Sequence, residues 1–371
     1  MKNAARINDI ALAIGGRYMV SLSVNLSDRP ASTLFSLWDL GISSYHPIQI
    51  LTRFLEPRVG LELRLFFPDP TIPHVFFIVS VQRSSPIVVL VHQVSLLNHS
   101  SITFLTSLEM RAATPSDPCL VDLLPESHKI MVSTKCNRKI SWWIWDFLNN
   151  TGARLIGPDW SVTKGAHLLP FNDIIIFASR NMVAVYNTPP TTCSYLSDQI
   201  IPKHDALLVV EVSSAASEAF YIHHHSCSPT TRKSTDCRYL LRLDSHRLTV
   251  LELIPIPGDD PLVPKKCPVR KGDLDVSDAK LYGAAQGSHI DGCGEYICVS
   301  GLESNGASVS MLQVRLSGKN GRTVNLDFLN AGLGHASDIE VDTREFCPFL
   351  GRECILASNG QVILYDYLVP R

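Results

Sequence analysis

The stretch Ile140-Ser-Trp-Trp-Ile-Trp-Asp-Phe147 decides the fold. Its side chains alternate with period two, so that Trp142 and Ile144 share one face of a strand and Trp145 and Phe147 lie on the other. A strand that is apolar on both faces, and rich in aromatic and β-branched residues, is typical of a sheet that is covered on both sides. The sequence therefore predicts a buried strand inside such a sheet.

The ending of this strand recurs in distant parts of the chain. It is found as Phe35-Ser-Leu-Trp-Asp-Leu40 and as Val362-Ile-Leu-Tyr-Asp-Tyr367, with a looser version in Val183-Ala-Val-Tyr-Asn187. Repetition of one strand ending at wide spacing is the signature of a repeated supersecondary unit. We therefore expect a repeat architecture made of β-sheets.

Candidate units share one form, in which an apolar strand and a short polar turn lead into a second strand that ends in an acidic or amide residue. Polar turns of two to five residues between such strands are typical of hairpins. The paired strands are expected at 10–14 and 18–24, 75–81 and 87–91, 129–133 and 140–147, 174–178 and 182–186, 219–222 and 239–244, 296–300 and 309–316, and 353–357 and 361–366.

The spacing of the unit ends, about 40 to 70 residues, brackets that of a four-stranded propeller blade. We predict an all-β fold: a β-propeller of about seven irregular four-stranded blades. It is expected to form a single domain over residues 1–371, with long loops near 226–238 and 255–280.

Composition excludes several classes of protein. With 18% charged and 45% hydrophobic residues, the chain is globular, and its net charge of −2 offers no general attraction to nucleic acid or anionic lipid. The longest apolar region, Val75 to Val91, is interrupted by Gln82-Arg-Ser-Ser-Pro86, so we predict no membrane span. The 10 cysteines contain no Cys-x-x-Cys pair and indicate reduced thiols. We expect a cytoplasmic or nuclear monomer.

The last unit carries a more specific signal. Gly334-His335 precedes Tyr365-Asp366, and this arrangement resembles a WD-repeat blade, in which a Gly-His pair opens the repeat and a Trp-Asp pair closes its third strand. Trp38-Asp39 and Trp145-Asp146 match the closing pair, and Tyr186-Asn187 matches it loosely. The resemblance implies a WD-repeat-like propeller with degenerate blades.

We interpret these repeat positions as structural. A carboxylate that follows the third strand can accept hydrogen bonds in the turn to the outer strand, and the aromatic side chains would pack between adjacent blades. Trp145→Ala is therefore expected to destabilise the protein more than any change in the cluster His223-His-His225.

Over most of the chain, the sequence is similar to the C-terminal region of mushroom-type fungal F-box proteins. Their degenerate propellers show strand endings such as Ser141-Trp-Trp-Ile-Trp-Asp-Phe-Leu148, followed by a turn like Asn149-Asn-Thr-Gly152. The resemblance implies an ancestral role in substrate recognition for a ubiquitin ligase. The F-box itself, which docks the ligase adaptor in that family, is expected to be absent, because residues 1–25 have the pattern of strands.

One cluster has the residue types of a metal site: His223-His-His225, with His204, Cys227 and Cys237 nearby. Structural zinc needs four convergent ligands. Consecutive histidines in an extended segment point to alternate sides, so at most two can face one ion. We interpret the cluster as a solvated strand end or loop, with metal binding as the alternative, and expect no metal or other cofactor.

No nucleophile elbow, phosphate-binding loop or His-Glu-x-x-His pair is present, so we expect no catalytic residues. Charged residues of both signs gather in the predicted loop near 255–280, and we interpret them as a solvated turn, not as a glycosidase pair or a phosphate site. They are Asp259, Asp260, Lys265, Lys266, Arg270, Lys271, Asp273, Asp275 and Asp278.

These patterns favour a non-catalytic protein-interaction platform whose loops bind an unidentified protein partner, because a rigid scaffold leaves recognition to its loops. The alternative is an enzyme or small-ligand binder that uses the central channel of the propeller. That alternative predicts several polar or ionisable side chains converging at one mouth of the channel.

Overall fold

The computed structural model describes residues 6–366, apart from 14, 26–30, 42–46, 98, 111–118, 125–126, 137–138, 160–166, 172, 179–181, 192, 195–207, 212–218, 224–238, 245–246, 259, 261–262, 276–288, 294–295, 304–305, 315–325, 333–340 and 348–351. Within these ranges all regular elements are β-strands. The same ranges contain no helix with the length and apolar character needed to span a membrane.

The strands of the described residues pair into seven antiparallel sheets, numbered here in chain order. Sheet 1 contains β1 (Ile7–Leu12), β2 (Tyr18–Asn25), β3 (Ser32–Asp39) and β4 (Gln49–Glu56). Sheet 2 contains β5 (Leu61–Pro68), β6 (Val75–Gln82), β7 (Ile87–Ser95) and β8 (Ser101–Met110). Sheet 3 contains β9 (Cys119–Leu123), β10 (Lys129–Cys136), β11 (Lys139–Asp146) and β12 (Thr151–Asp159), and the short β16 (Cys193–Ser194) pairs outside β12.

The other sheets repeat this order. Sheet 4 contains β13 (His167–Pro170), β14 (Ile174–Ala178), β15 (Met182–Asn187) and β17 (Leu208–Glu211). Sheet 5 contains β18 (Ala219–His223), β19 (Tyr239–Asp244), β20 (Arg247–Pro255) and β21 (Lys266–Asp275). Sheet 6 contains β22 (His289–Cys293), β23 (Tyr296–Glu303), β24 (Gly306–Val314) and β25 (Leu326–Gly332). Sheet 7 contains β26 (Val341–Cys347), β27 (Arg352–Ala357) and β28 (Val362–Asp366).

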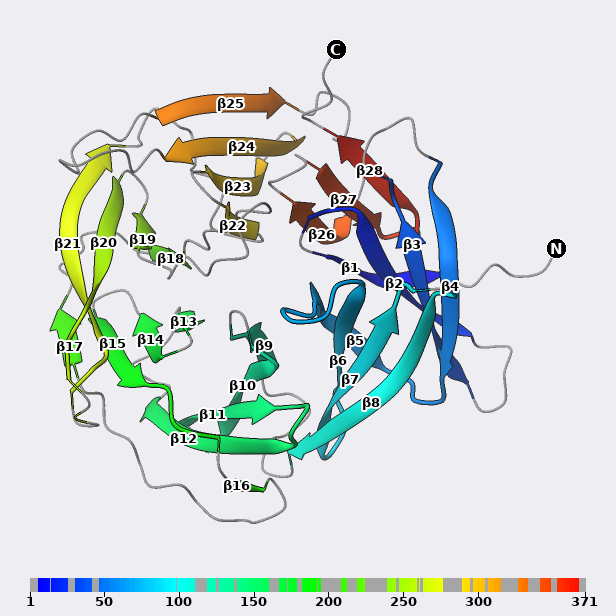
Figure 1. Ribbon diagram of the computed structural model, residues 1–371. Coiled ribbons are helices and arrows are strands. Elements are labelled where there is room, and N and C mark those ends of the chain that lie inside the picture. The colour runs from blue at the N-terminus through cyan, green and yellow to red at the C-terminus, as the bar shows by residue number, and fades with distance from the viewer. Residues whose placement is uncertain are drawn as a thin grey trace.

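The sheets are arranged around a common centre, with the first strand of each sheet innermost (Figure 1). The innermost strands contact one another in the order β1, β5, β9, β13, β18, β22 and β26, and β26 in turn contacts β1. The fourth strand of each of the first six sheets, counted from the centre, is followed in the chain by the innermost strand of the next. The fold is thus an all-β propeller arrangement, which confirms the predicted fold class at this level.

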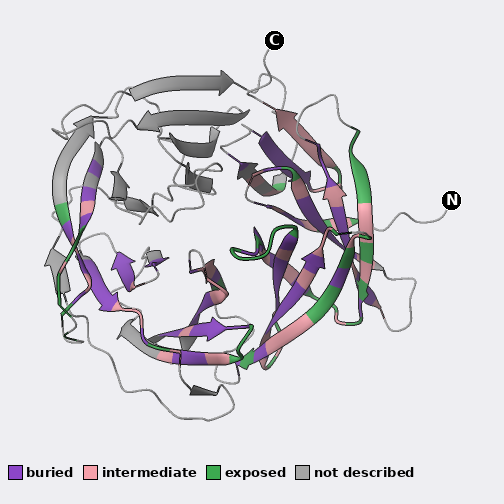
Figure 2. Cartoon of the chain, in the orientation of Figure 1, coloured by how far each residue is buried: buried purple, intermediate pink, exposed green. Residues whose placement is uncertain are grey.

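The core lies between adjacent sheets, and β11 shows why. The Trp142 ring stacks on Phe177 of sheet 4, with ring centroids 6.0 Å apart. Trp145, on the opposite face, belongs to the apolar cluster shared by sheets 2 and 3, in which Phe147 meets Phe77 edge to face at 4.9 Å. Both indoles are fully buried, and buried strands line these interfaces (Figure 2). The alternation in the sequence therefore predicted correctly that both faces of this strand are covered.

One predicted loop is wrong in part. Residues 266–275 of the loop expected near 255–280 form β21, the outer strand of sheet 5. The segment contains Pro268 and several charged residues, which suggested a loop. An outer strand exposes one edge to solvent, so it tolerates both proline and charge. The loop predicted near 226–238 lies outside the described residues.

Candidate functional site

The predicted repeat positions gather polar contacts where the third strand of a sheet ends. In sheet 1, Asp39 accepts hydrogen bonds from Arg17, Nε at 3.1 Å and Nη2 at 2.8 Å, and from the backbone N–H of Gly41 at 2.9 Å. Trp38 donates its indole N–H to the Ser21 hydroxyl at 2.8 Å. Asp39 therefore fixes the turn that leaves β3.

In sheet 3, Asp146 accepts hydrogen bonds from the backbone N–H of Asn149 at 3.1 Å and from its side-chain amide at 3.0 Å. Trp145 donates its indole N–H to the Asn150 side-chain oxygen at 3.2 Å. Asn150 has a φ of 50°, a left-handed conformation that asparagine tolerates better than most residues. The Trp-Asp pair and the turn after it thus form one hydrogen-bonded unit.

In sheet 4, Asn187 binds the chain of the neighbouring sheet. Its amide donates to the Val263 carbonyl at 2.9 Å, and its side-chain oxygen accepts from the backbone N–H of Lys265 at 2.9 Å. Tyr186 lies edge to face on Trp142, with centroids 5.0 Å apart. These two residues therefore join sheet 4 to both of its neighbours.

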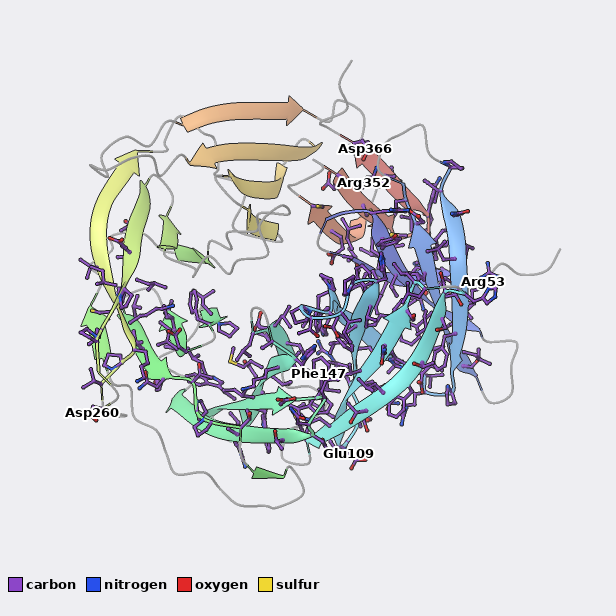
Figure 3. The ribbon with its side chains drawn as sticks, in the orientation of Figure 1. Arg53, Glu109, Phe147, Asp260, Arg352 and Asp366 are labelled. Atoms are coloured by element: carbon purple, nitrogen blue, oxygen red, sulfur yellow. The ribbon has the colours of Figure 1, made fainter. Side chains whose placement is uncertain are left out.

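In sheet 7, Asp366 is held by Arg352, whose Nε and Nη2 approach its two carboxylate oxygens at 2.6 and 3.0 Å. The Arg352 Nη1 donates to the carbonyls of Gly16 and Gly41 in sheet 1, at 3.0 and 2.7 Å. Arg352 is 1% exposed, and Figure 3 shows it beside Asp366 where the first and last sheets meet. Tyr365 lies opposite Glu353 in the register of β27 and β28. This contact joins the last sheet to the first.

The remaining predicted residues are not placed by the described part of the chain. His335, His204, Cys227, Cys237, Asp259 and Asp278 lie outside it, as do His224 and His225. His223 ends β18, and its side chain is not described. Of the charged residues near 255–280, Lys266 is buried and pairs with Asp173 at 3.3 Å, so this side chain is not part of a solvated turn. The described part of the chain contains no group of three residues that could hold a metal ion.

A different group of residues lies at the opposite end of the sheets, where the innermost strands begin. Three neighbouring innermost strands, β26, β1 and β5, each contain a β-bulge near this end. In each strand, two residues that are two apart pair with consecutive residues of the neighbouring strand, so one residue is extra. In β26, Val341 and Thr343 pair with Ala357 and Leu356. In β1, Ile7 and Asp9 pair with Ser23 and Leu22, and in β5, Leu63 and Leu65 pair with Ser80 and Val79. The extra residues in the three strands are Asp342, Asn8 and Arg64. Bulges reorient side chains and are over-represented next to functional sites.

Asp9 holds two of these strands together. One of its carboxylate oxygens accepts the backbone N–H of Leu63 in β5 at 2.7 Å, and the other accepts that of Ile10 at 3.0 Å. Burial raises the pKa of Asp9, and these two hydrogen bonds and the nearby Arg64 oppose the rise. The bulge in β1 thus places a half-buried carboxyl group against the bulge in β5.

Charged side chains continue around this group. Glu62 accepts a hydrogen bond from Arg64 and another from the Arg83 Nε at 3.1 Å. Arg6 donates to the Ser358 carbonyl and lies 3.7 Å from the Asp342 carboxylate. We name this group the inner-rim cluster and define it by seven residues of sheets 7, 1 and 2: Arg6, Asn8, Asp9, Glu62, Arg64, Arg83 and Asp342.

The inner-rim cluster presents both donors and acceptors to solvent. The side chains of Arg6 and Asp342 are 60% and 44% exposed, and those of Arg83 and Glu62 are 36% and 39% exposed. Its arginines and carboxyl groups are equal in number, so neither sign of charge is in excess. Such a surface can form several charge-assisted hydrogen bonds with a partner that carries both signs.

Comparison with known proteins finds matches among solved structures alone. No family model matches it, and no curated protein is similar to it in sequence. Among solved structures, the β-propeller domain of the Trilobed protease from Pyrococcus furiosus aligns at 8% identity and a TM-score of 0.45, over 99% of each chain. Hsv2 from Kluyvelomyces marxianus aligns at 8% identity and a TM-score of 0.46, over 98% of each chain. The Pyrococcus horikoshii acylaminoacyl peptidase aligns at 8% identity and 0.49, over 98% of this chain and 51% of that one.

Proposed function

We propose that the seven sheets are the blades of a single seven-bladed propeller, and that it binds a protein partner through the inner-rim cluster. The observation that supports this function is the set of three adjacent bulges in β26, β1 and β5. Each bulge adds one unpaired polar residue to its strand. All three lie at the end of the sheets where the innermost strands begin. The innermost strands β9, β13, β18 and β22 have regular registers in the described residues.

The charge pattern favours a protein over a small ligand. Small-molecule sites are concave and mostly apolar, with a few convergent polar groups. The inner-rim cluster instead consists of charged side chains that already pair with one another and remain partly exposed, as between Arg83 and Glu62. Arginine is enriched at protein interfaces, and the rims of such interfaces are polar. Mixed charge also makes this site selective, since like charges brought face to face are unfavourable.

The finer hypothesis is that the partner is a substrate of a ubiquitin ligase. It is supported by the resemblance of the Trp-Asp strand ending and its turn, Ser141 to Gly152, to fungal F-box propellers. Fusing the chain to an F-box and measuring ubiquitin transfer to the captured partner would test this hypothesis. Capture without any ubiquitin transfer would remove the ligase role and leave the platform role in place.

The platform role is tested by reversing exposed charges. Arg6→Glu and Arg83→Glu, combined, should abolish capture of the partner in quantitative cross-linking mass spectrometry. The folded state should tolerate both changes, because exposed ion pairs contribute only about 0–1 kcal/mol. The control is Glu109→Lys on β8, a charge reversal at an exposed position of an outer strand (Figure 3). An identical set of captured proteins for the rim variant and the control would refute the proposal.

A further inference from the structure

Sheet 7 differs from the other sheets in its outer edge. In the described residues it ends at β28, whereas each other sheet has at least one further strand outside its third (Figure 1). The backbone N–H of Ala357 donates to the Gln361 carbonyl, which sets the alternation of the β27–β28 ladder. The backbone groups of Val362 and Leu364 therefore point to the open edge. β28 is half-buried along its length, while β27 is buried throughout.

The neighbouring outer strand, β4, exposes apolar side chains on the same side. The register places Ile50, Arg53 and Leu55 opposite Trp38, Ser36 and Leu34, and Trp38 packs in the cluster shared with sheet 7. Ile50 and Leu55 are 37% and 54% exposed. On the other face of β4, Leu51 and Phe54 pack against sheet 2, whose outer strand β8 contacts β4.

The contact between β4 and β8 shows that outer strands of adjacent sheets in this molecule touch. A strand added to the edge of β28 would therefore lie against the exposed face of β4. It would cover Ile50 and Leu55 with apolar side chains at alternate positions. Between them stands Arg53, which projects outward at the rim and has no carboxylate partner among the described residues (Figure 3).

We propose that β28 accepts, as a fourth strand, an extended segment of a partner protein with an apolar residue, an acidic residue and a second apolar residue at alternating positions. Main-chain hydrogen bonds to Val362 and Leu364 would supply affinity. Contacts of its side chains with Ile50, Arg53 and Leu55 would supply specificity, as is general for strand addition. This surface stands apart from the inner-rim cluster and does not depend on the proposed function.

The test uses a short fluorescein-labelled peptide that places valine, glutamate and valine at alternating positions among threonines. Fluorescence anisotropy should show saturable binding to the full chain. Arg53→Glu should weaken binding by roughly tenfold, since it replaces an attraction with a repulsion at a partly exposed site. A peptide with lysine in place of glutamate should bind the Arg53→Glu variant better than it binds the native protein. Such a charge swap separates a direct contact from a general loss of folding.

Hydrogen exchange identifies the edge itself. The amides of Val362 and Leu364 should exchange rapidly in the free protein and become protected when the peptide binds. Protection of both amides in the free protein would show that the edge is already occupied, and would overturn the proposal. It is equally overturned if the peptide binds the Arg53→Glu variant and the native protein alike, or if no peptide binding is measured.

Discussion

Replacing Arg352 with methionine should cause the largest loss of stability of any single charge removal in the described chain. The guanidinium is 1% exposed, forms two hydrogen bonds with Asp366, and donates to two carbonyls of sheet 1. Methionine would fill part of the volume but would leave a carboxylate and two carbonyls without these donors. Removing one partner of a buried ion pair costs about 3–5 kcal/mol. That is a large fraction of the stability of an ordinary domain.

The chain supplies a control with the same chemistry and different burial. Arg17 also donates two hydrogen bonds to an aspartate, Asp39, but the Arg17 side chain is 44% exposed. Arg17→Met should cost less than Arg352→Met, because Asp39 keeps the hydrogen bond from the Gly41 N–H and, unlike Arg352, Arg17 is half-exposed and is not the donor to two carbonyls of another sheet. Urea unfolding followed by tryptophan fluorescence measures both variants, since Trp142 and Trp145 are buried in β11 of sheet 3, away from the substitutions.

Two outcomes would refute this reasoning. If Arg352→Met loses no more stability than Arg17→Met, the contact between the last and first sheets does not hold the ring together. If the double variant Arg352→Met/Asp366→Leu is less stable than Arg352→Met alone, the cost does not come from an unpaired buried carboxylate. We expect the double variant to recover part of the loss, because neutral replacement of both partners removes the buried charge.

Three further predictions follow from burial. Trp145→Ala should lower the free energy of unfolding by about 3–5 kcal/mol, and Trp143→Ala, whose side chain is only half-buried, by less than half of that; equal losses in thermal unfolding would contradict the assigned difference in burial. Burial raises the pKa of Asp122 to about 7, so stability should fall as pH rises from about 4 to about 7, and Asp122→Asn should flatten this dependence of the melting temperature. Burial lowers the pKa of His92, although its hydrogen bond to Glu56 opposes this shift, so stability should fall as pH drops below about 6.5. His92→Gln should reduce that fall, and an unchanged pH dependence of the melting temperature in the variant would contradict this role of His92.

The hairpins inside the outer strands could be predicted from the sequence, because their strands are short, strongly apolar and separated by polar turns. The strands expected at 75–81 and 87–91, for example, are the paired β6 and β7. Outer strands escaped prediction because solvent on one edge weakens the pattern. In β4 the extra residue Leu51 places Ile50 opposite Trp38 and Thr52 opposite Leu37. Residues two apart therefore fall on different faces, and the period-two signal is lost.

The inner-rim cluster could not be predicted because it depends on the contact between the last sheet and the first. Asp342 and Arg6 are far apart in the sequence and meet only because β26 contacts β1. One local signal was present in Leu61-Glu-Leu-Arg-Leu-Phe-Phe67. Leu61, Leu63 and Phe66 pack toward sheet 1, so the apolar alternation changes phase at Arg64. A phase change inside an otherwise regular strand indicates a bulge, and bulges are worth examining as sites.

Arginine–carboxylate pairs lie at both ends of the sheets, and their burial decides whether they contribute to stability. Arg352 with Asp366 is 1% and 13% exposed, whereas Arg83 with Glu62 is 36% and 39% exposed. A buried pair stabilises the fold, because removing one partner leaves the other charged group unpaired and without water. An exposed pair contributes little to folding, so its loss should leave unfolding almost unchanged. Any strong effect of changing Arg83 must therefore be measured in binding, and this makes the exposed end of the ring the place to look for function.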